Sequence, residues 1–599
     1  MARAHRPGAG PTGGVSGDAT RASRGFITRP CHSGAMTDPI ARPWLHSYAP
    51  DVPADIEPVT GSLVDLIDDA VSTYRQKPAL EFFGRETSYR DLGDQVARAA
   101  EGLRRLGVGR GDRVALILPN SPQHVVAFYA VLRLGAVVVE HNPLYTDREL
   151  RHLFEDHGAT IAIAWDKLVD RLRALPADIG FSTVVSVDVT KGMPLGTRLA
   201  LKLPVPAAKK SRAALTDGAE GDVTWQGLLS NRPLRKKHPR PDVDDIALLQ
   251  YTSGTTGSPK GAILTHRNLR SNAAQGRAWV PGLVDGDETV YGVLPFFHAY
   301  GLTLCLTFAM SIGARLVLFP KFDVDLVLKA AKKHPPTFLP AVPPIYQRLA
   351  DAARERGVDL SSARFAISGA MNLPTAVVQA WEGVTGGLLV EGFGLTETSP
   401  VALGNPIGPT RRVGTVGVPF PSTEAMVVDR DDPDPSRPVV AGAAGELLLR
   451  GPQVFRGYWN RPDETAEAFL EGGWFRTGDI VTMSTDGYVT IVDRIKELIV
   501  TGGFNVAPSE VEEAVRNAPG VAEVAVVGLP RSGGGEDVVA AVVLEPGASF
   551  DAEAIRDASR GQLAAYKVPR RVVQLDELPK SLIGKVLRRE VRDRLIAAG

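Results

Sequence analysis

A glycine- and hydroxyl-rich stretch around one lysine has the residue types that bind a triphosphate. It reads Tyr251-Thr-Ser-Gly-Thr-Thr-Gly-Ser-Pro-Lys-Gly261. Backbone N–H groups that glycine leaves accessible, together with hydroxyls and the ammonium of Lys260, form a cradle for an anion. Ser-Pro separates Gly257 from Lys260, which excludes the common P-loop, where Gly, Lys and Ser/Thr are adjacent. The alternative is a plain hairpin turn, because apolar runs at 246–249 and 262–264 flank the stretch.

A second stretch offers a carboxylate at the end of an expected strand. Gly392-Phe-Gly-Leu-Thr-Glu-Thr398 directly follows an apolar run at 388–390. Ligands of open α/β sheets bind at the carboxyl ends of the strands. This position favours a ligand role for Glu397 over the role of a solvated surface charge.

Three further side chains stand in stretches that suit chemistry, and each has a plainer alternative. Asp479 ends Trp474-Phe-Arg-Thr-Gly-Asp479 and either accepts hydrogen bonds from two hydroxyls or caps a turn. His298 stands in an apolar run and either orients a carboxylate or is a satisfied core residue. Lys585 lies in Leu578-Pro-Lys-Ser-Leu-Ile-Gly-Lys-Val-Leu-Arg588 and is either a mobile catalytic ammonium or part of a basic, solvated helix start.

In this order the motifs resemble those of the AMP-forming adenylating enzymes. That superfamily contains acyl-CoA synthetases, aryl-CoA ligases, luciferases and the adenylation domains of peptide synthetases. The resemblance extends from about Ser62 to Arg594. It implies ATP, Mg²⁺ and CoA: a carboxylate attacks the α-phosphate of ATP, pyrophosphate leaves, and the acyl group passes to CoA. Because both reactants of the first step are anions, the site needs cations and hydrogen-bond donors.

The resemblance also assigns residues to the first half-reaction. It implies that Thr252 and Glu397 are magnesium ligands and that Thr396 contacts the α-phosphate. Lys585 would bridge the substrate carboxylate and the α-phosphate, and His298 would orient the acyl carboxylate. The residues implied to bind ATP or CoA are Thr252, Ser253, Gly254, Thr255, Thr256, Gly257, Lys260, Gly369, Ala370, Gly392, Phe393, Gly394, Asp479, Arg494, Gly502 and Gly503.

Other implied roles concern the ribose and the second half-reaction. Asp479 would accept from the ribose diol, and Arg494 would reach the ribose or a phosphate. Lys496 matches the position of a hinge about which the small domain turns between the half-reactions. Gly502 and Gly503 resemble the loop that lines the pantetheine tunnel, where small residues let a thin chain approach the backbone.

Two positions depart from the family pattern. Phe393 stands where tyrosine is commoner, which keeps a ring along the adenine and removes a hydroxyl contact. Val500 stands where several relatives carry a second lysine. We therefore expect the thioester step to depend less on side-chain charge in this chain.

Composition excludes several other classes of protein. Acidic and basic residues balance at 68 each, which argues against a general nucleic-acid binder. Cys31 and Cys305, far apart in sequence, predict a reduced, cytoplasmic compartment and exclude a cysteine zinc site. The apolar run at 302–312 is shorter than the about 20 residues of a membrane span and predicts a buried helix.

Apolar periodicity predicts an α/β fold beyond the N-terminal segment. Ser62 and Ser88 are expected to cap helices, and Thr146 with Glu149 to form a capping box. The continuous apolar run at 113–118 is typical of a strand buried on both faces. The alternation of such patterns predicts helices layered on mostly parallel sheets.

We expect a leader and two domains. Residues 1–57 are rich in glycine, proline and arginine and predict a disordered leader, within which Met36 is a plausible start. Residues 58–492 are expected to form a large AMP-binding domain with several α/β subdomains. Shorter strand and helix patterns at 493–599 predict a small, mobile C-terminal α+β domain.

An insert at residues 186–235 mixes basic and apolar side chains, and two interpretations stay open. It is either a solvated surface segment or an interfacial patch that holds an anionic membrane at the inner face. The insert resembles one in long-chain fatty-acid enzymes, and the apolar run at 302–312 can wall a tunnel. Both features favour a medium- or long-chain fatty acid over an aryl acid.

Three alternatives to a fatty-acid–CoA ligase remain. One is an aryl-CoA ligase, and another is an acyl-AMP ligase that loads a separate carrier protein. A multimodular peptide synthetase is disfavoured because no carrier motif follows before Gly599. The third is a non-catalytic ATP- or lipid-binding homologue, which would be expected to have lost Lys585, Glu397 or Asp479, and all three are present.

Overall fold

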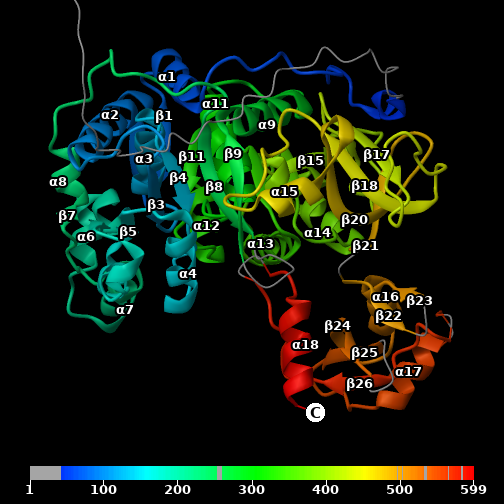
Figure 1. Cartoon of the computed structure of the whole chain (residues 1–599). Helices are drawn as coiled ribbons and strands as arrows, with labels where there is room; N and C mark the ends of the chain where they lie inside the picture. Colours follow the sequence, from blue (N-terminus) through cyan, green and yellow to red (C-terminus); the bar gives the residue numbers. More distant parts are fainter. Residues whose placement is uncertain are drawn as a thin grey trace, which may run out of the picture. The chain divides into compact units, whose positions relative to one another are not determined.

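Two mostly parallel sheets form the centre of the large α/β region (Figure 1). The computed structural model describes residues 42–252, 259–494, 497–501, 504–531, 536–560, 562–563, 565–581 and 584–598. One sheet has the order β16 (Val418–Pro419), β15 (Val401–Gly404), β14 (Leu388–Gly394), β13 (Phe365–Ser368), β12 (Phe338–Ala341), β10 (Thr289–Gly292), β11 (Arg315–Leu318), β1 (Pro78–Phe82), β2 (Arg85–Ser88). The other has the order β7 (Val223–Thr224), β6 (Thr183–Val187), β5 (Ile161–Trp165), β3 (Arg113–Ile117), β4 (Val137–Glu140), β8 (Ile246–Thr252), β9 (Lys260–Thr265).

Antiparallel pairs occur at the edges of these sheets. Strands β14 to β1 run parallel, whereas β2, β15 and β16 pair antiparallel with their neighbours. In the other sheet β8 and β9 form the antiparallel pair, and the remaining neighbours are parallel. The predicted fold class, α/β with mostly parallel sheets, is confirmed.

Strand β3 shows why its apolar run is continuous. Val114 and Leu116 belong to the main core, which lies on one face of the sheet. Ala115 and Ile117 belong to a second cluster on the opposite face. Successive side chains of a strand point to opposite faces, so a strand covered on both sides needs apolar residues at every position.

The helices begin where the sequence places caps. Ser62 caps α1 (Leu63–Thr73) and Ser88 caps α2 (Tyr89–Arg105). Thr146 and Glu149 form the predicted capping box of α4 (Asp147–His157). Helix α3 (Pro122–Arg133) contacts β1 of one sheet and β3 and β4 of the other, and it is buried on all sides. It therefore lies between the two sheets, as a helix apolar all round requires.

A smaller antiparallel sheet completes the large region (yellow in Figure 1). Its order is β17 (Glu424–Val428), β18 (Ala444–Arg450), β20 (Trp474–Met483), β19 (Phe469–Leu470), with β21 (Val489–Arg494) also paired to β20. The segment at 429–438 connects β17 and β18, as its Asp- and Pro-rich sequence predicts.

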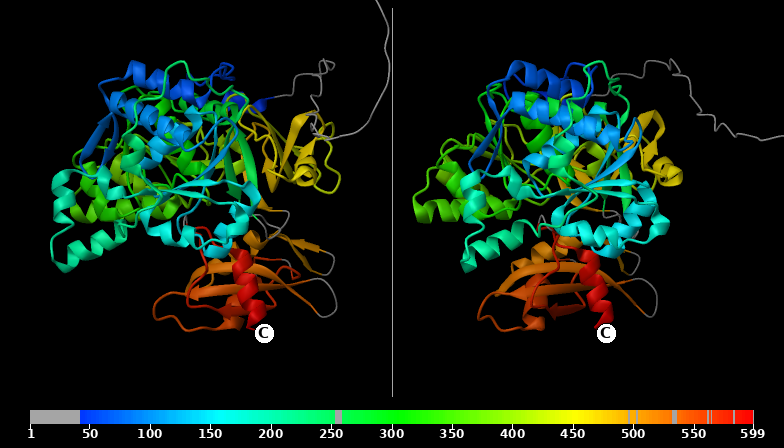
Figure 2. Two further views of the ribbon diagram at one scale, coloured as in Figure 1. Left: turned by 60° about the vertical axis from the view of Figure 1, so that its left-hand side comes forward. Right: turned by 90° about the vertical axis from the view of Figure 1, so that its left-hand side faces the viewer.

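The C-terminal residues form a three-layer α+β unit. Strands β24 (Val521–Pro530), β25 (Glu536–Leu544) and β26 (Arg571–Gln574) form its main sheet, and β22 (Ile499–Thr501) pairs with β23 (Phe504–Val506). Val524 and Val526 face α16 (Pro508–Arg516) and α17 (Ala552–Arg560). Ala525 and Val527 face α18 (Arg588–Ala597), which Figure 2 shows in red along one face of the sheet.

The expectation of a disordered leader through residue 57 is wrong for residues 42–57. Trp44 is 1% exposed and packs against Gly487, and Tyr48 meets Trp279 edge to face with 5.1 Å between ring centroids. Low average hydrophobicity hid a local aromatic cluster of one buried ring, Trp44, and one half-buried ring, Tyr48, which packs this short segment onto the large region. Residues 1–41 lie outside the described residues.

The apolar run at 302–312 is buried, as predicted, but its first part is not an α-helix. Residues Leu302–Thr307 form a π-helical segment that leads into α11 (Phe308–Ser311). Such segments are rare and are frequent at functional sites. Among the described residues, no helix combines the length and the apolarity that crossing a bilayer requires.

Candidate active site

The proposed triphosphate cradle lies between two paired strands. Strand β8 ends at Thr252, and Thr252 pairs with Lys260, the first residue of β9. This antiparallel pair is common to the cradle and to the plain turn, so it agrees with both interpretations. Ser253, Gly254, Thr255, Thr256 and Gly257 lie outside the described residues.

Lys260 is held over an aromatic ring. Its Nζ lies 5.3 Å from the ring centroid of Tyr458 and 4.0 Å from Oε1 of Glu464. The lysine side chain is 16% exposed. A cation over the face of a tyrosine is attracted by the negative charge density of the ring.

Glu397 contacts the hydroxyl of the same tyrosine. It lies in a 3₁₀ turn, η6 (Thr396–Thr398), which follows β14 and contacts β9. Its Oε1 accepts a hydrogen bond of 2.7 Å from the hydroxyl of Tyr458. The expected phosphate-binding lysine and the expected metal ligand are therefore brought together through one side chain that the sequence analysis missed.

The expected adenine-binding residues line the adjoining ends of β13 and β14. A Cβ added to Gly369 would lie 3.2 Å from the ring of Tyr300, and one added to Gly394 would lie 1.7 Å from the carbonyl oxygen of Pro400. Gly394 therefore cannot be replaced without moving the backbone. Ala370 has a positive φ of 68°, and Phe393 is half-buried on β14.

Glu391, between these residues, is a buried carboxyl that sequence reasoning missed. It is 7% exposed and lies opposite Ser368 in the parallel register of β13 and β14. Burial raises the pKa of Glu391 to about 8, and a hydrogen bond from the backbone of Leu373 opposes this rise. Its side chain is therefore largely neutral at pH 7.

His298 is held by a loop that two buried amides fix between the sheets. Asn120 donates to the carbonyls of Gly292 and Leu294 at 3.0 and 2.7 Å. Gln250 donates to the carbonyl of Phe297, next to His298, at 2.6 Å. Neither amide was expected from the sequence, because each partner is distant along the chain.

His298 is a neutral imidazole at pH 7. Its Nδ1 accepts a hydrogen bond of 3.3 Å from the backbone N–H of Tyr300. Burial and, to a smaller extent, the positive charge of Lys585 lower the pKa of His298 to about 4. It can therefore act on a carboxylate through a hydrogen bond and not through a full charge.

The expected ribose residues stand opposite each other in one strand pair. Asp479 on β20 pairs with Arg494 on β21, and Asp479 is 2% exposed. The side chain of Arg494, and the whole of Lys496, Gly502 and Gly503, lie outside the described residues.

The lysine of the C-terminal motif stands in a short turn. Its backbone N–H donates to Oγ of Ser581 at 3.2 Å, and its carbonyl accepts from the backbone N–H of Ser581 at 2.7 Å. The positive charge of Lys585 contributes to the lowered pKa of His298, so the two expected catalytic residues interact electrostatically.

The carboxylate of Glu397 and the hydroxyl of Thr252 suit a magnesium ion that is held mainly by phosphate oxygens and water. Among the described residues, no three His, Cys, Asp or Glu side chains converge into a protein-only metal cage. Mg²⁺ in nucleotide sites takes one or two carboxylates and completes its shell from phosphates and water. One carboxylate, Glu397, near the hydroxyl-bearing end of β8 fits that requirement.

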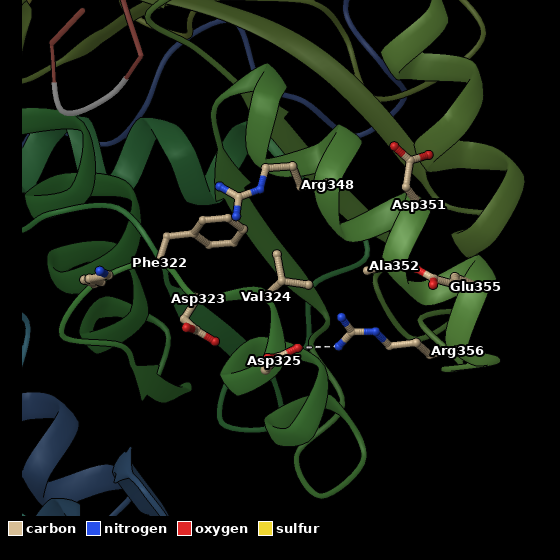
Figure 3. A pocket seen from close by; sticks show the side chains of 10 residues that line it. Phe322, Asp323, Val324, Asp325, Arg348, Asp351, Ala352, Glu355 and Arg356 are labelled. Atoms are coloured by element: carbon tan, nitrogen blue, oxygen red, sulfur yellow. Dashed lines mark hydrogen bonds and ion pairs between the residues drawn. The ribbon is translucent and has the colours of Figure 1, made fainter. Parts of the chain in front are cut away.

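A surface pocket of about 660 Å³ includes none of these residues (Figure 3). It lies between α12 (Val324–Ala331) and α13 (Pro343–Arg356), where Asp325 and Arg356 form an ion pair. Arg348 lies over the ring of Phe322, 5.1 Å from its centroid. Because it includes none of the expected site residues, we assign it no role.

Comparisons with known proteins identify the family of this chain. The chain matches the AMP-binding enzyme family over residues 67–459 and the AMP-binding enzyme C-terminal domain over residues 510–585. A long-chain-fatty-acid–CoA ligase of Bacillus subtilis is 37% identical over 553 residues, which cover 92% of this chain and 97% of that protein. A protein of the same name from Escherichia coli O157:H7 is 39% identical over 568 residues, covering 92% and 98%.

A solved structure shares the fold. ATP-bound MatB from Rhodopseudomonas palustris matches with a TM-score of 0.77 and 30% identity, covering 90% of this chain and 99% of that one. The resemblance drawn from the motifs is confirmed: this chain belongs to the AMP-binding enzyme family, with its C-terminal domain.

Proposed function

We propose that this chain uses ATP to join a medium- or long-chain fatty acid to CoA. The observation that carries the proposal is the contact of Lys260 with the ring of Tyr458 and of Glu397 with its hydroxyl, each residue standing at or next to the end of a strand. A cation and a carboxylate so arranged suit a triphosphate with its metal ion. The acid and the thiol are inferred from relatives that are named long-chain-fatty-acid–CoA ligases.

In the first half-reaction we assign the reacting groups to the residues expected from the motifs. An oxygen of the fatty-acid carboxylate attacks the α-phosphorus, the bond to the bridging oxygen breaks, and pyrophosphate leaves. Lys585 and Thr396 stabilise the charge that develops on the α-phosphate, and His298 orients the carboxylate. Thr252 and Glu397 would hold Mg²⁺, which would supply positive charge for the leaving pyrophosphate.

In the second half-reaction the sulfur of CoA attacks the acyl carbon, and the bond to the phosphate oxygen breaks to release AMP. We assign the hinge to Lys496 and the pantetheine tunnel to Gly502 and Gly503. These roles presuppose a large domain at 58–492 and a small one at 493–599, which we propose as the units that move.

A fatty acid is favoured over an aryl acid by the apolar segment behind His298. Leu302, Leu304, Leu306 and Phe308 are all at most 1% exposed. Side chains of this kind can line a channel for an alkyl chain. An aryl-CoA ligase and an acyl-AMP ligase that loads a carrier protein are the alternatives, and they differ in the acid and in the acceptor.

We further propose that the insert holds the enzyme on an anionic membrane at its cytoplasmic face. Leu195, Leu199 and Leu203 are 72%, 66% and 53% exposed on and beside α6 (Leu195–Ala200). The neighbouring α7 (Pro206–Leu215) exposes Lys209 and Lys210. Apolar side chains beside basic ones on short surface helices suit peripheral lipid binding.

One assay tests the reaction and its branch. The purified chain is supplied with ATP, Mg²⁺, CoA and a panel of fatty and aryl acids, and pyrophosphate and thioester are followed separately. We expect both products, with the highest kcat/KM for medium or long fatty acids. Preference for aryl acids would contradict the acid, and pyrophosphate without thioester would contradict CoA as the acceptor.

A further inference from the structure

An extended segment, residues 455–459, joins the strand that carries Lys260 to the turn that carries Glu397. One of its edges pairs with β9 and the other reaches η6. Three backbone hydrogen bonds join the segment to β9: Ile263 N–H to the Gly457 carbonyl (2.9 Å), Arg456 N–H to the Ile263 carbonyl (3.0 Å) and Trp459 N–H to the Gly261 carbonyl (2.8 Å). A fourth joins it to η6, from the N–H of Phe455 to the carbonyl of Glu397 (2.8 Å). The 455–459 segment is therefore fixed to both elements.

Tyr458 is the side chain of this segment that reaches both expected phosphate and metal residues. Its hydroxyl donates to Oε1 of Glu397 at 2.7 Å, and the ammonium of Lys260 lies 5.3 Å from its ring centroid. Its backbone N–H donates to Oγ1 of Thr465 at 2.9 Å, which fixes the start of the side chain. A phenol is protonated at neutral pH, so the hydroxyl is a hydrogen-bond donor.

We propose that Tyr458 is a positioning residue that keeps Lys260 and Glu397 at a fixed separation for a triphosphate and its metal ion. The inference rests on the proposed function, in which these two residues bind the nucleotide. Its hydroxyl engages Oε1 of Glu397 and so orients the carboxylate that would bind the metal ion. Its ring holds the ammonium of Lys260 at the start of β9.

The chemistry of a phenol explains why this position needs a tyrosine. A direct ion pair between Lys260 and Glu397 would tie the phosphate-binding cation to the metal-binding carboxylate, whereas the carboxylate that Lys260 approaches is that of Glu464, at 4.0 Å. Tyr458 instead takes the cation on its face and the anion on its hydroxyl, and remains uncharged itself. Groups that orient a metal-binding carboxylate in this way affect metal affinity by about 10–100-fold.

Two substitutions at this position separate the hydroxyl from the ring. Calorimetry measures ATP affinity with Mg²⁺ and with EDTA, and pyrophosphate release is followed against Mg²⁺ concentration. Tyr458→Phe is expected to raise the Mg²⁺ concentration for half-maximal rate about tenfold, with ATP affinity in EDTA unchanged. Tyr458→Leu is expected to weaken ATP binding in EDTA as well. Tyr89→Phe, which removes another buried tyrosine hydroxyl (2.7 Å to the Ala314 carbonyl), is the control and should change neither quantity.

Glu397→Gln distinguishes failure of the inference from failure of the proposed function. Because Tyr458 is expected to act through Glu397, the double variant with Tyr458→Phe should show the Mg²⁺ dependence of Glu397→Gln alone. A normal Mg²⁺ dependence for Tyr458→Phe, or an additive loss in the double variant, overturns the inference while the function stands. A normal Mg²⁺ dependence for Glu397→Gln overturns the assigned metal role and the inference with it.

Discussion

Lys585 is the single charge that the proposed mechanism places at the reacting phosphate. We predict that Lys585→Ala lowers pyrophosphate formation by about 10²–10³-fold, the usual effect of removing one group that stabilises transition-state charge. Thioester formation from supplied acyl-AMP should largely survive, because that step breaks a different bond. The measurement is a separate rate for each half-reaction.

A nearby lysine provides the control for this prediction. Lys580 forms an ion pair of 2.6 Å with Glu523 on β24, and Lys580→Ala should leave both half-reactions unchanged. Equal losses in the two half-reactions of Lys585→Ala would remove Lys585 from the adenylation step.

The buried carboxyl of Glu391 should make the free energy of unfolding depend on pH, and the direction of that dependence follows from its raised pKa. Its pKa is raised from 4.5 to about 8 by burial, so the folded protein binds this proton more tightly than the unfolded chain. The associated stability is fully present below pH 4.5 and is lost as pH rises toward 8, by at most roughly 5 kcal/mol. Glu391→Gln cannot ionise, so its unfolding free energy should fall less between pH 5 and 8 than that of the wild type.

The comparison is made by urea denaturation at several pH values. Glu355→Gln, at an exposed position of α13, serves as the control and should follow the wild-type curve. Parallel curves for the wild type and Glu391→Gln would contradict a buried, neutral carboxyl.

At the scale of elements, the sequence predicts what lies within one stretch and misses what joins two. Lys260, Glu397 and Asp479 stand in short motifs, and β3 and the capped helices follow from local periodicity. Tyr458 and Glu397 are 61 residues apart, and Asn120 and Leu294 are 174 apart. Their contacts depend on which strands become neighbours, and that order is set by the packing of the whole sheet.

The first residue of α18 couples the Lys585 turn to both sides of the expected hinge. Arg588 binds Glu512 through two hydrogen bonds of 2.8 and 2.7 Å and forms an ion pair with Glu497. It also lies 3.9 Å from Asp493, which is 3% exposed. One guanidinium thus contacts Asp493 and Glu497, which flank position 496 in the sequence, and Glu512 on α16.

We predict that Arg588→Ala destabilises the protein by about 3–5 kcal/mol, because it leaves buried carboxylates without their cation. Arg588→Lys should recover only part of this, since an ammonium cannot bind a carboxylate in bidentate fashion. Arg589→Ala is the control: Arg589 is exposed and lies 4.0 Å from Asp593, so its loss should be small. Equal unfolding midpoints for the alanine variants in urea would contradict the role of Arg588.

At the scale of the whole molecule, residues 42–57 tie together parts that are far apart in the chain. The carbonyl of Ser47 accepts from Thr410 at 2.8 Å, and the hydroxyl of Tyr48 donates to the carbonyl of Pro419 at 2.7 Å. Trp44→Ala should therefore cost about 3–5 kcal/mol of unfolding free energy, as for other buried aromatics. Leu45→Ala, at a half-buried position, is the control and should lower the unfolding free energy by less. Both variants are measured by denaturant titration. An equal loss of unfolding free energy in the two variants would contradict the packing of Trp44.

The membrane role that we propose for the insert concerns where the enzyme meets its substrate. Fatty acids partition into bilayers, so a surface-bound enzyme would reach them directly. The exposed residues Lys202, Lys209, Lys210 and Arg212 lie beside exposed leucines. Each basic residue near an anionic surface contributes about 1 kcal/mol, and salt screens it beyond a Debye length of about 8–10 Å. Together they would contribute a few kcal/mol to the proposed reversible binding.

We therefore predict that the chain co-sediments with anionic vesicles at low salt, and not with neutral ones. Binding should be lost in high salt and in a variant with all four basic residues changed to Gln.

A matched variant that changes Lys321, Lys329, Lys332 and Lys333, exposed on and around α12, removes the same charge elsewhere and should still bind. Changing Leu195, Leu199 and Leu203 to Ser should weaken binding even though charge is retained, because apolar insertion contributes separately from charge. If the wild type ignores anionic vesicles at low salt, or if both charge variants lose binding equally, the insert is a solvated surface segment.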